Sequence, residues 1–139
     1  MLTYANNLTI IPLNVTDHAI VTPEMVNYID YKGKTKLAKP LLDYYYAFYK
    51  KRNPQIKGSP IHDALTLMAS IHNEMFTFKT LPVYIVTAYE GIQRGQSIAD
   101  IRPYIQFEET AKKHRIAFFF DYPMFFNEFM SIMTGEAFK

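Results

Sequence analysis

The sequence predicts a single α/β domain with an open, mostly parallel sheet and flanking helices. Short β-rich segments alternate with helical segments along the 139 residues. This alternation is typical of a sheet covered by helices rather than of a barrel or a bundle. Hydrophobic residues occupy 49% of positions and aromatic residues 16%, which is enough apolar surface to fill one core. We therefore expect one domain over residues 1–139, without internal repeats or low-complexity segments.

The N-terminal part predicts a strand followed by a helix. Residues 8–15 are rich in Leu and Ile and contain Pro12, so we expect a strand that ends or bulges near this proline, before a loop at 16–18. Thr22 precedes a proline, and a threonine cap with proline at the first helical position is a typical helix start. This helix is expected to give way to a loop at 31–36.

A second helix is predicted over residues 36–52, and Pro40 either starts its regular part or kinks it. Residues 53–58 contain a proline and a glycine and break this helix. The helix carries large apolar side chains at helical spacing, namely Leu37, Leu41, Tyr45, Phe48 and Tyr49.

The next helix, predicted over residues 60–72, carries the residues of greatest chemical interest. We expect Ser59 to be its N-cap and Pro60 its first residue, because the missing N–H of proline costs nothing there. Its buried stripe is expected to be Ile61, Leu65, Met68 and Ile71. Apolar residues surround most of its circumference, which predicts a central element. His62 and Asp63 then lie in its first turn.

The remaining elements are again strands and helices. A hairpin with glycines at 91 and 95 joins the first two of these strands, and Gly135 closes the last helix. We expect strands at 82–89, 96–99 and 115–121, a short helix at 108–113 and a final helix at 123–133.

Charge and cysteine content exclude several classes of function. The formal net charge is only +2, so the chain lacks the basic surface that binding to nucleic acid or an anionic membrane requires. The absence of cysteine excludes disulfides, thiolate nucleophiles and cysteine-based zinc sites. The N-terminus does not resemble a signal peptide, and the longest apolar run is too short to span a bilayer. We expect a soluble cytoplasmic protein.

His62 and Asp63 place an imidazole beside a carboxylate at a helix start. The helix dipole favours the ionised form of Asp63 there, which leaves its oxygens free for a hard cation. His62 is then placed to point into a cleft. The alternative is purely structural, with Asp63 supporting the helix N-terminus and His62 lying half-buried.

Residues 58–69, Gly-Ser-Pro-Ile-His-Asp-Ala-Leu-Thr-Leu-Met-Ala, resemble the C-terminal signature of the inosine-uridine preferring nucleoside hydrolases. Other stretches resemble this family in the same order and spacing, at 7–16, 20–24, 90–100 and 118–126. The resemblance covers nearly the whole chain but only the C-terminal portion of the family domain. The family's N-terminal Asp-x-Asp-x-Gly-x-Asp-Asp cluster, which supplies calcium ligands and the base for the attacking water, does not occur in this sequence.

The resemblance implies the C-terminal half of a nucleoside hydrolase-like fold and a role for each candidate residue. The family reaction is hydrolysis of the N-glycosidic bond of ribonucleosides to ribose and free base. By resemblance, Asp63 is a Ca²⁺ ligand and His62 lies beside the nucleobase as acid for the leaving group. Tyr45 and Tyr49 approach the nucleobase by resemblance, although tyrosines at this spacing also pack helices together.

Two further expectations concern activity and partners. Without the carboxylate cluster, the isolated chain is expected to be inactive, and the alternative function is that of an inactive truncated or split-gene product acting as a partner subunit. An open sheet edge and uncovered apolar surface favour association. The expected partners are a ribonucleoside substrate and either the missing N-terminal half or a second copy of the chain. A His-Asp phosphohydrolase is disfavoured, because such an enzyme arranges further histidines on helices.

Overall fold

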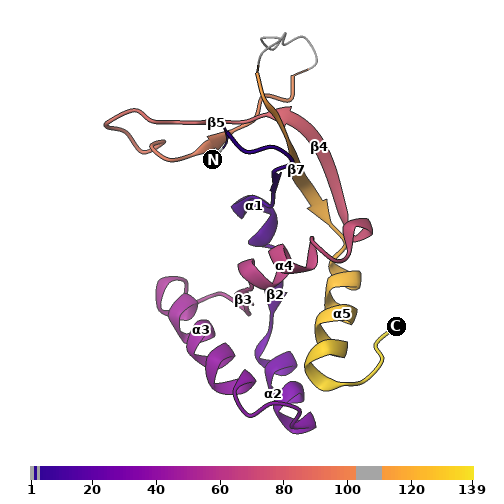
Figure 1. Ribbon diagram of the computed structural model, residues 1–139. Coiled ribbons are helices and arrows are strands. Elements are labelled where there is room, and N and C mark those ends of the chain that lie inside the picture. Colours follow the sequence, from indigo (N-terminus) through magenta and orange to yellow (C-terminus); the bar gives the residue numbers. More distant parts are fainter. Residues whose placement is uncertain (1, 3, 103–110) are drawn as a thin grey trace.

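The computed structural model describes residues 2, 4–102 and 111–139. A small sheet lies at one end of the molecule and three longer helices lie at the other (Figure 1). Two short helices, α1 and α4, lie between these two parts, and a hairpin extends sideways from the sheet (Figure 1). None of the helices in the described ranges is both long enough and apolar enough to cross a membrane.

The main sheet has three strands in the order β1-β7-β4. β1 (Thr9–Ile10) runs parallel to β7 (Lys113–Phe120), and β4 (Phe76–Pro82) runs antiparallel to β7. The predicted α/β class with flanking helices is confirmed, and the sheet is mixed, with one parallel pair and one antiparallel pair. The strand predicted at 115–121 is confirmed as β7.

The first strand is shorter than predicted and is followed by an unpredicted helix. Pro12 has extended backbone angles (φ −78°, ψ 160°) and ends the strand, as expected from its missing N–H. The chain then forms the single helical turn α1 (Leu13–Thr16). Val15 and Thr16 are buried, so tertiary packing rather than intrinsic propensity holds this short helix.

α2 (Pro23–Lys32) and α5 (Tyr122–Thr134) confirm two predicted helices. The Thr22 hydroxyl caps α2 by accepting from the Met25 N–H at 3.4 Å. In α5 the Asp121 carboxylate has the same role. Gly33 and Gly135 end these helices in the left-handed conformation, which glycine adopts without steric cost. α2 extends two residues into the predicted loop.

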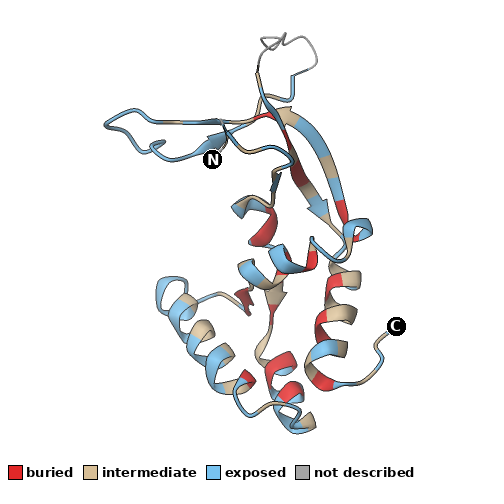
Figure 2. Ribbon diagram, in the orientation of Figure 1, coloured by how far each residue is buried: buried red, intermediate tan, exposed pale blue. Residues whose placement is uncertain are grey.

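α3 (Ala38–Arg52) confirms the second predicted helix, and Pro40 lies in its first turn, where its missing donor is tolerated. Its apolar stripe is divided between two environments. Tyr45 and Tyr49 are partly buried, whereas Leu37, Leu41 and Phe48 are exposed. Figure 2 shows that most of this helix is exposed.

α4 (His62–Met68) begins two residues later than predicted. Ser59 and Pro60 are not its cap and first residue, because they form β3 and pair antiparallel with β2 (Ile20–Val21). The pairing continues through the Ile61 N–H, which donates to the Ala19 carbonyl at 2.9 Å.

The predicted extent of this helix is also wrong. α4 ends at Met68, and the chain turns into the 3₁₀ helix η1 (Asn73–Met75). Leu65 and Met68 are buried as predicted, but Ile71 lies beyond the helix and is exposed. A helix of two turns buries one narrow face, so the expectation of a helix covered on several sides is not met.

The hairpin β5 (Tyr84–Ile85) and β6 (Ser97–Ile98) lies within the two predicted strands and is largely exposed. β4 precedes the first of these and was not predicted as a strand. The short helix predicted at 108–113 lies in part outside the described residues, and β7 already begins at Lys113.

The core lies where α2, α4 and α5 meet below the sheet, and Figure 2 shows buried segments on all three. Its fully buried large side chains include Ile29, Leu65, Met75 and Phe125. The Tyr122 hydroxyl of α5 donates to the Ile20 carbonyl of β2 at 2.7 Å. The core thus fixes the β2–β3 pair, and this pair delivers the chain to His62.

Replacement of Gly58 by alanine is expected to destabilise the protein by about 1–3 kcal/mol. A Cβ at this position would lie 2.6 Å from the Val21 carbonyl oxygen and 2.6 Å from the Ile20 Cγ2. The backbone oxygen cannot move without disturbing the β2–β3 pair. Urea denaturation of Gly58→Ala measures the loss, and the exposed neighbour Lys57→Ala is the control, with an expected change within about 0.5 kcal/mol. Equal stability of Gly58→Ala and the wild type would contradict this packing.

Candidate functional site

His62 is the first residue of α4, and hydrogen bonds hold its ring on both sides. Its Nδ1 lies 2.8 Å from the Thr16 Oγ1 and its Nε2 lies 2.9 Å from the Tyr49 Oη. The side chain is 21% exposed, so one edge of the ring remains accessible to solvent. This geometry excludes a surface histidine without partners and describes an imidazole with a fixed orientation.

Thr16 and Asp17, at the C-terminal end of α1, complete the surroundings of this ring. The Asp17 Oδ1 lies 3.9 Å from the His62 Nε2, and the Asp17 side chain is 53% exposed. At this distance the carboxylate makes no hydrogen bond to the ring. Neither residue was predicted as part of the site, because nothing in the local sequence connects them with a turn some 45 residues away.

The two predicted tyrosines lie beside His62. The ring centroids of Tyr45 and Tyr49 are 5.1 Å apart in an edge-to-face arrangement, and those of Tyr49 and His62 are 6.3 Å apart. Burial raises the pKa of Tyr45 to about 12, helped by a hydrogen bond to Tyr49 and by the negative charges of Tyr49 and Asp63. The structure thus brings Tyr45, Tyr49, His62 and Asp63 into one region.

Asp63 is exposed at the second position of α4. Calcium takes about six to eight oxygen ligands, and within the described part of the chain no three His, Asp or Glu residues are grouped so that they could hold a metal ion. The residues present therefore do not form a complete calcium site. Asp63 offers one carboxylate at a helix start and no more.

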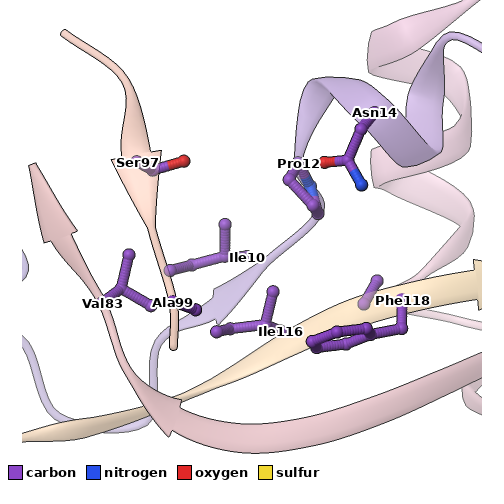
Figure 3. A pocket seen from close by; sticks show the side chains of 9 residues that line it. Ile10, Pro12, Asn14, Val83, Ser97, Ala99, Ile116 and Phe118 are labelled. Carbon is purple, nitrogen blue, oxygen red and sulfur yellow. The ribbon is translucent and has the colours of Figure 1, made fainter. Parts of the chain in front are cut away.

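Asn14 links the cavities next to the site. A cavity of about 170 Å³ lies between β1, β7 and the hairpin, and Figure 3 shows Asn14 and Pro12 at its α1 end with Ile10, Ile116 and Phe118 from the sheet. A more open polar groove shares Asn14 and is also lined by Asp17 and Arg94. Asp17 lines this groove and lies 3.9 Å from the His62 Nε2, but His62, Tyr45 and Tyr49 are not among the residues that line the groove.

Tyr45 is expected to lose its proton only at high pH, with a pKa of about 12 against an ordinary value of 10.0 for tyrosine. The fold favours its neutral form, so the stability that this form contributes is complete below about pH 10 and is lost as the pH rises toward 12. Ultraviolet titration of the wild type and of Tyr45→Phe tests this expectation, because the difference between the two curves isolates Tyr45. A difference curve with its midpoint near 10 would contradict the burial of this hydroxyl.

A comparison with known protein families matches most of this chain. Residues 1–127 match the sequence profile of a family described as inosine-uridine preferring nucleoside hydrolase. A comparison with curated protein sequences gave no significant match.

Two solved structures have a similar fold. A purine-preferring ribonucleoside hydrolase from Gardnerella vaginalis superposes with a TM-score of 0.76 and is 24% identical, over 93% of this chain and 40% of that one. A plant nucleoside hydrolase superposes with a TM-score of 0.76 and is 16% identical, over 94% of this chain and 42% of that one. At these identities the likeness shows the fold, and this chain spans about two fifths of the length of either structure.

Proposed function

The chain belongs to the inosine-uridine preferring nucleoside hydrolase family, and from this premise we propose that it supplies the side of the active site that protonates the departing base. The reaction is hydrolysis of the N-glycosidic bond of a ribonucleoside to ribose and free base. The observation that carries this proposal is His62, which is fixed through both ring nitrogens and still one-fifth exposed.

The chemistry requires a proton at the base. As the C1′–N bond breaks, its electron pair stays on the nitrogen of the base, while water adds to C1′ and loses a proton. Histidine is the side chain most often used to exchange protons near neutral pH. His62 donates to the departing base from Nε2, once the base has taken the place of the Tyr49 hydroxyl that lies 2.9 Å from this nitrogen.

The tyrosines of α3 form the wall on one side of this imidazole. Tyr49 donates or accepts at the His62 Nε2, and Tyr45 contacts Tyr49 edge-to-face. Aromatic side chains suit a flat heterocycle, because they present apolar area with a polar tip. We assign Tyr45 and Tyr49 to binding of the nucleobase beside His62.

The water and the ribose need groups from another segment. Asp63 would contribute one ligand to a calcium ion whose remaining ligands are supplied from elsewhere. Among the described residues, no three His, Asp or Glu side chains are grouped so that they could hold a metal ion and its water.

The sheet offers a place for such a segment. Among the described residues β1 is an edge strand that pairs with β7 alone, and an apolar cavity lined by Leu2, Leu8 and Ile11 lies along it. An unpaired edge with apolar surface beside it binds another strand readily. The complementary segment is either a further part of a longer polypeptide or a separate subunit. If it is a separate subunit, the second candidate function is that this chain is an inactive partner of it.

Reconstitution tests this proposal. The chain is mixed with the N-terminal portion of a nucleoside hydrolase that carries the Asp-rich cluster, and ribose release from inosine and uridine is followed in the presence of calcium. We expect turnover by the mixture and none by the N-terminal portion alone. A mixture that forms a stable complex but releases no ribose would contradict the catalytic role and favour the partner subunit.

A further inference from the structure

We propose that Thr16 is a positioning residue that fixes the neutral His62 imidazole with its proton on Nδ1, so that Nε2 accepts from Tyr49. For its catalytic meaning this inference rests on the proposed function, whereas the arrangement of hydrogen bonds stands independently of it. Thr16 and His62 are 46 positions apart in the sequence, and the β2–β3 pair brings α1 and α4 together.

The burial of Thr16 limits the hydrogen-bond partners of its hydroxyl. Thr16 is 3% exposed, so its hydroxyl must find its partners within the protein. The oxygen lies 3.3 Å from the Leu13 carbonyl and 2.8 Å from the His62 Nδ1. A hydroxyl has one proton, and a helical threonine typically donates it to a carbonyl of the preceding turn. The lone pairs of the Thr16 oxygen then face Nδ1, which must carry a proton to donate.

The hydrogen bond at Nε2, on the other side of the ring, also agrees with a proton on Nδ1. In the neutral imidazole with a proton on Nδ1, Nε2 is an acceptor, and the Tyr49 Oη is 2.9 Å away. The Tyr49 hydroxyl has one proton, which it can donate to Nε2.

All the hydrogen bonds then run in one direction. Tyr49 donates to His62 Nε2, His62 Nδ1 to Thr16, and Thr16 to the Leu13 carbonyl. With the opposite tautomer, Thr16 would have to donate to Nδ1 and would lose its bond to Leu13. The observed arrangement satisfies one more polar contact in a partly buried site, where unsatisfied groups are costly.

Among the described residues, the Asp17 carboxylate is a charged group that lies near this ring. It lies 3.9 Å from Nε2 and is half exposed, so it does not hydrogen-bond to the neutral ring. Without the Thr16 hydroxyl, Nδ1 loses the acceptor of its proton, whereas a proton on Nε2 can be donated to the Tyr49 oxygen 2.9 Å away. Thr16 thus decides between two tautomers that the other groups leave open.

The assignment has a consequence for proton transfer. When the Tyr49 hydroxyl moves away from Nε2, a proton taken up there from water gives the imidazolium, whose Nδ1–H already donates to Thr16. Loss of the Nε2 proton to the departing base gives back the same neutral tautomer in the same orientation. The imidazole ring therefore does not need to rotate between one reaction cycle and the next. Removal of the groups that orient a functional histidine typically costs about 10–100-fold in activity, and we expect this range for Thr16→Val in the reconstituted enzyme.

The test is the tautomer of His62 in the 139-residue chain itself, measured by nuclear magnetic resonance on protein with ¹⁵N-labelled histidine. Spectra are recorded well above the ordinary pKa of histidine, and His62→Gln identifies the signals. We expect a protonated Nδ1 and an unprotonated Nε2 in the wild type. Thr16→Val, which replaces the hydroxyl by a methyl group of similar size, should shift the proton to Nε2, and Thr16→Ser should restore the wild-type pattern.

The matched control is Thr134→Val. Thr134 is also buried and donates to a helix carbonyl, that of Met130 at 2.7 Å, but it is bonded to no histidine. Its replacement should leave the His62 spectrum unchanged, whereas a purely structural effect of losing a buried hydroxyl would appear in both valine variants.

Three results would overturn the inference. These are a proton on Nε2 in the wild type, an unchanged tautomer in folded Thr16→Val, and an equal shift in Thr134→Val. If Thr16→Val does not fold, the wild type and Thr16→Ser still decide, because a proton on Nε2 in either of them contradicts the assignment. The expected tautomers without any ribose release from a reconstituted complex would contradict the proposed function and leave the role of Thr16 standing.

Discussion

Replacement of His62 by alanine is expected to slow nucleoside hydrolysis on the order of 10²–10⁴-fold once the complementary segment is present. The variant removes the imidazole that donates to the base, while the backbone of β3 and α4 is unaffected. The loss should appear mainly in kcat, because proton transfer to the leaving group occurs in the transition state. It should be smaller for nucleosides whose base departs easily. Steady-state rates of the reconstituted complex measure both effects.

His72→Ala is the matched control for this variant. His72 also has two polar partners on its ring, Glu74 at 3.3 Å and Glu128 at 3.2 Å, but it lies beyond the C-terminal end of α4. Its replacement should change kcat little. Equal losses for the two variants would show that His62 acts through the fold and not through the chemistry.

Replacement of Phe125 by alanine is expected to destabilise the protein by about 3–5 kcal/mol. Phe125 is fully buried on α5, and its ring lies 5.7 Å from Phe129 in a stacked arrangement and 5.8 Å from Phe120 edge-to-face. Its removal leaves a cavity where α5 packs against the end of the sheet. Such a loss is a large part of the total stability of a domain of this size. Urea denaturation of Phe125→Ala measures it.

Phe119→Ala serves as the control for this core substitution. Phe119 lies on β7 next to Phe120, but its side chain is 70% exposed. We expect its replacement to cost about 1 kcal/mol or less. If the two alanine variants were equally stable, the packing of α5 against the sheet would be wrong.

The elements that the sequence predicted well are those with local start and stop signals. Thr22 and Gly33 bound α2, and Gly135 ends α5 as expected from its place after an apolar run. These signals act within one helical turn, through hydrogen bonds to free N–H groups and through the left-handed conformation of glycine. The prediction did not need to know what packs against either helix.

The elements that were missed depend on contacts distant in sequence. Ser59 and Pro60 have the composition of a helix start, but pairing with Val21 and Ile20 makes them a strand. The register between β4 and β7 shifts between Thr77 and Phe78, where Phe118 of β7 is the extra residue. In β4 itself the alternation of apolar and polar residues ends at Lys79 and Thr80, two polar residues in succession, and so short an alternation did not identify the strand.

In the candidate site, too, the sequence identified only the residues that carry a local signal. His62, Asp63, Tyr45 and Tyr49 were recognised from a motif and a helical spacing, and the structure brings them together. Thr16 and Asp17 were not recognised, because a single helical turn has no periodicity and because their contact with His62 depends on the β2–β3 pair.

The activity of the 139-residue chain by itself tests the central claim most directly, namely that this chain supplies one side of an active site whose water-activating side lies elsewhere. Purified chain is incubated with inosine and uridine in the presence of calcium, and ribose release is followed over a long period. We expect no turnover above the uncatalysed rate, because the described residues offer no carboxylate cluster near His62. Robust turnover that is abolished in His62→Ala would contradict the claim and show that the chain contains a complete active site.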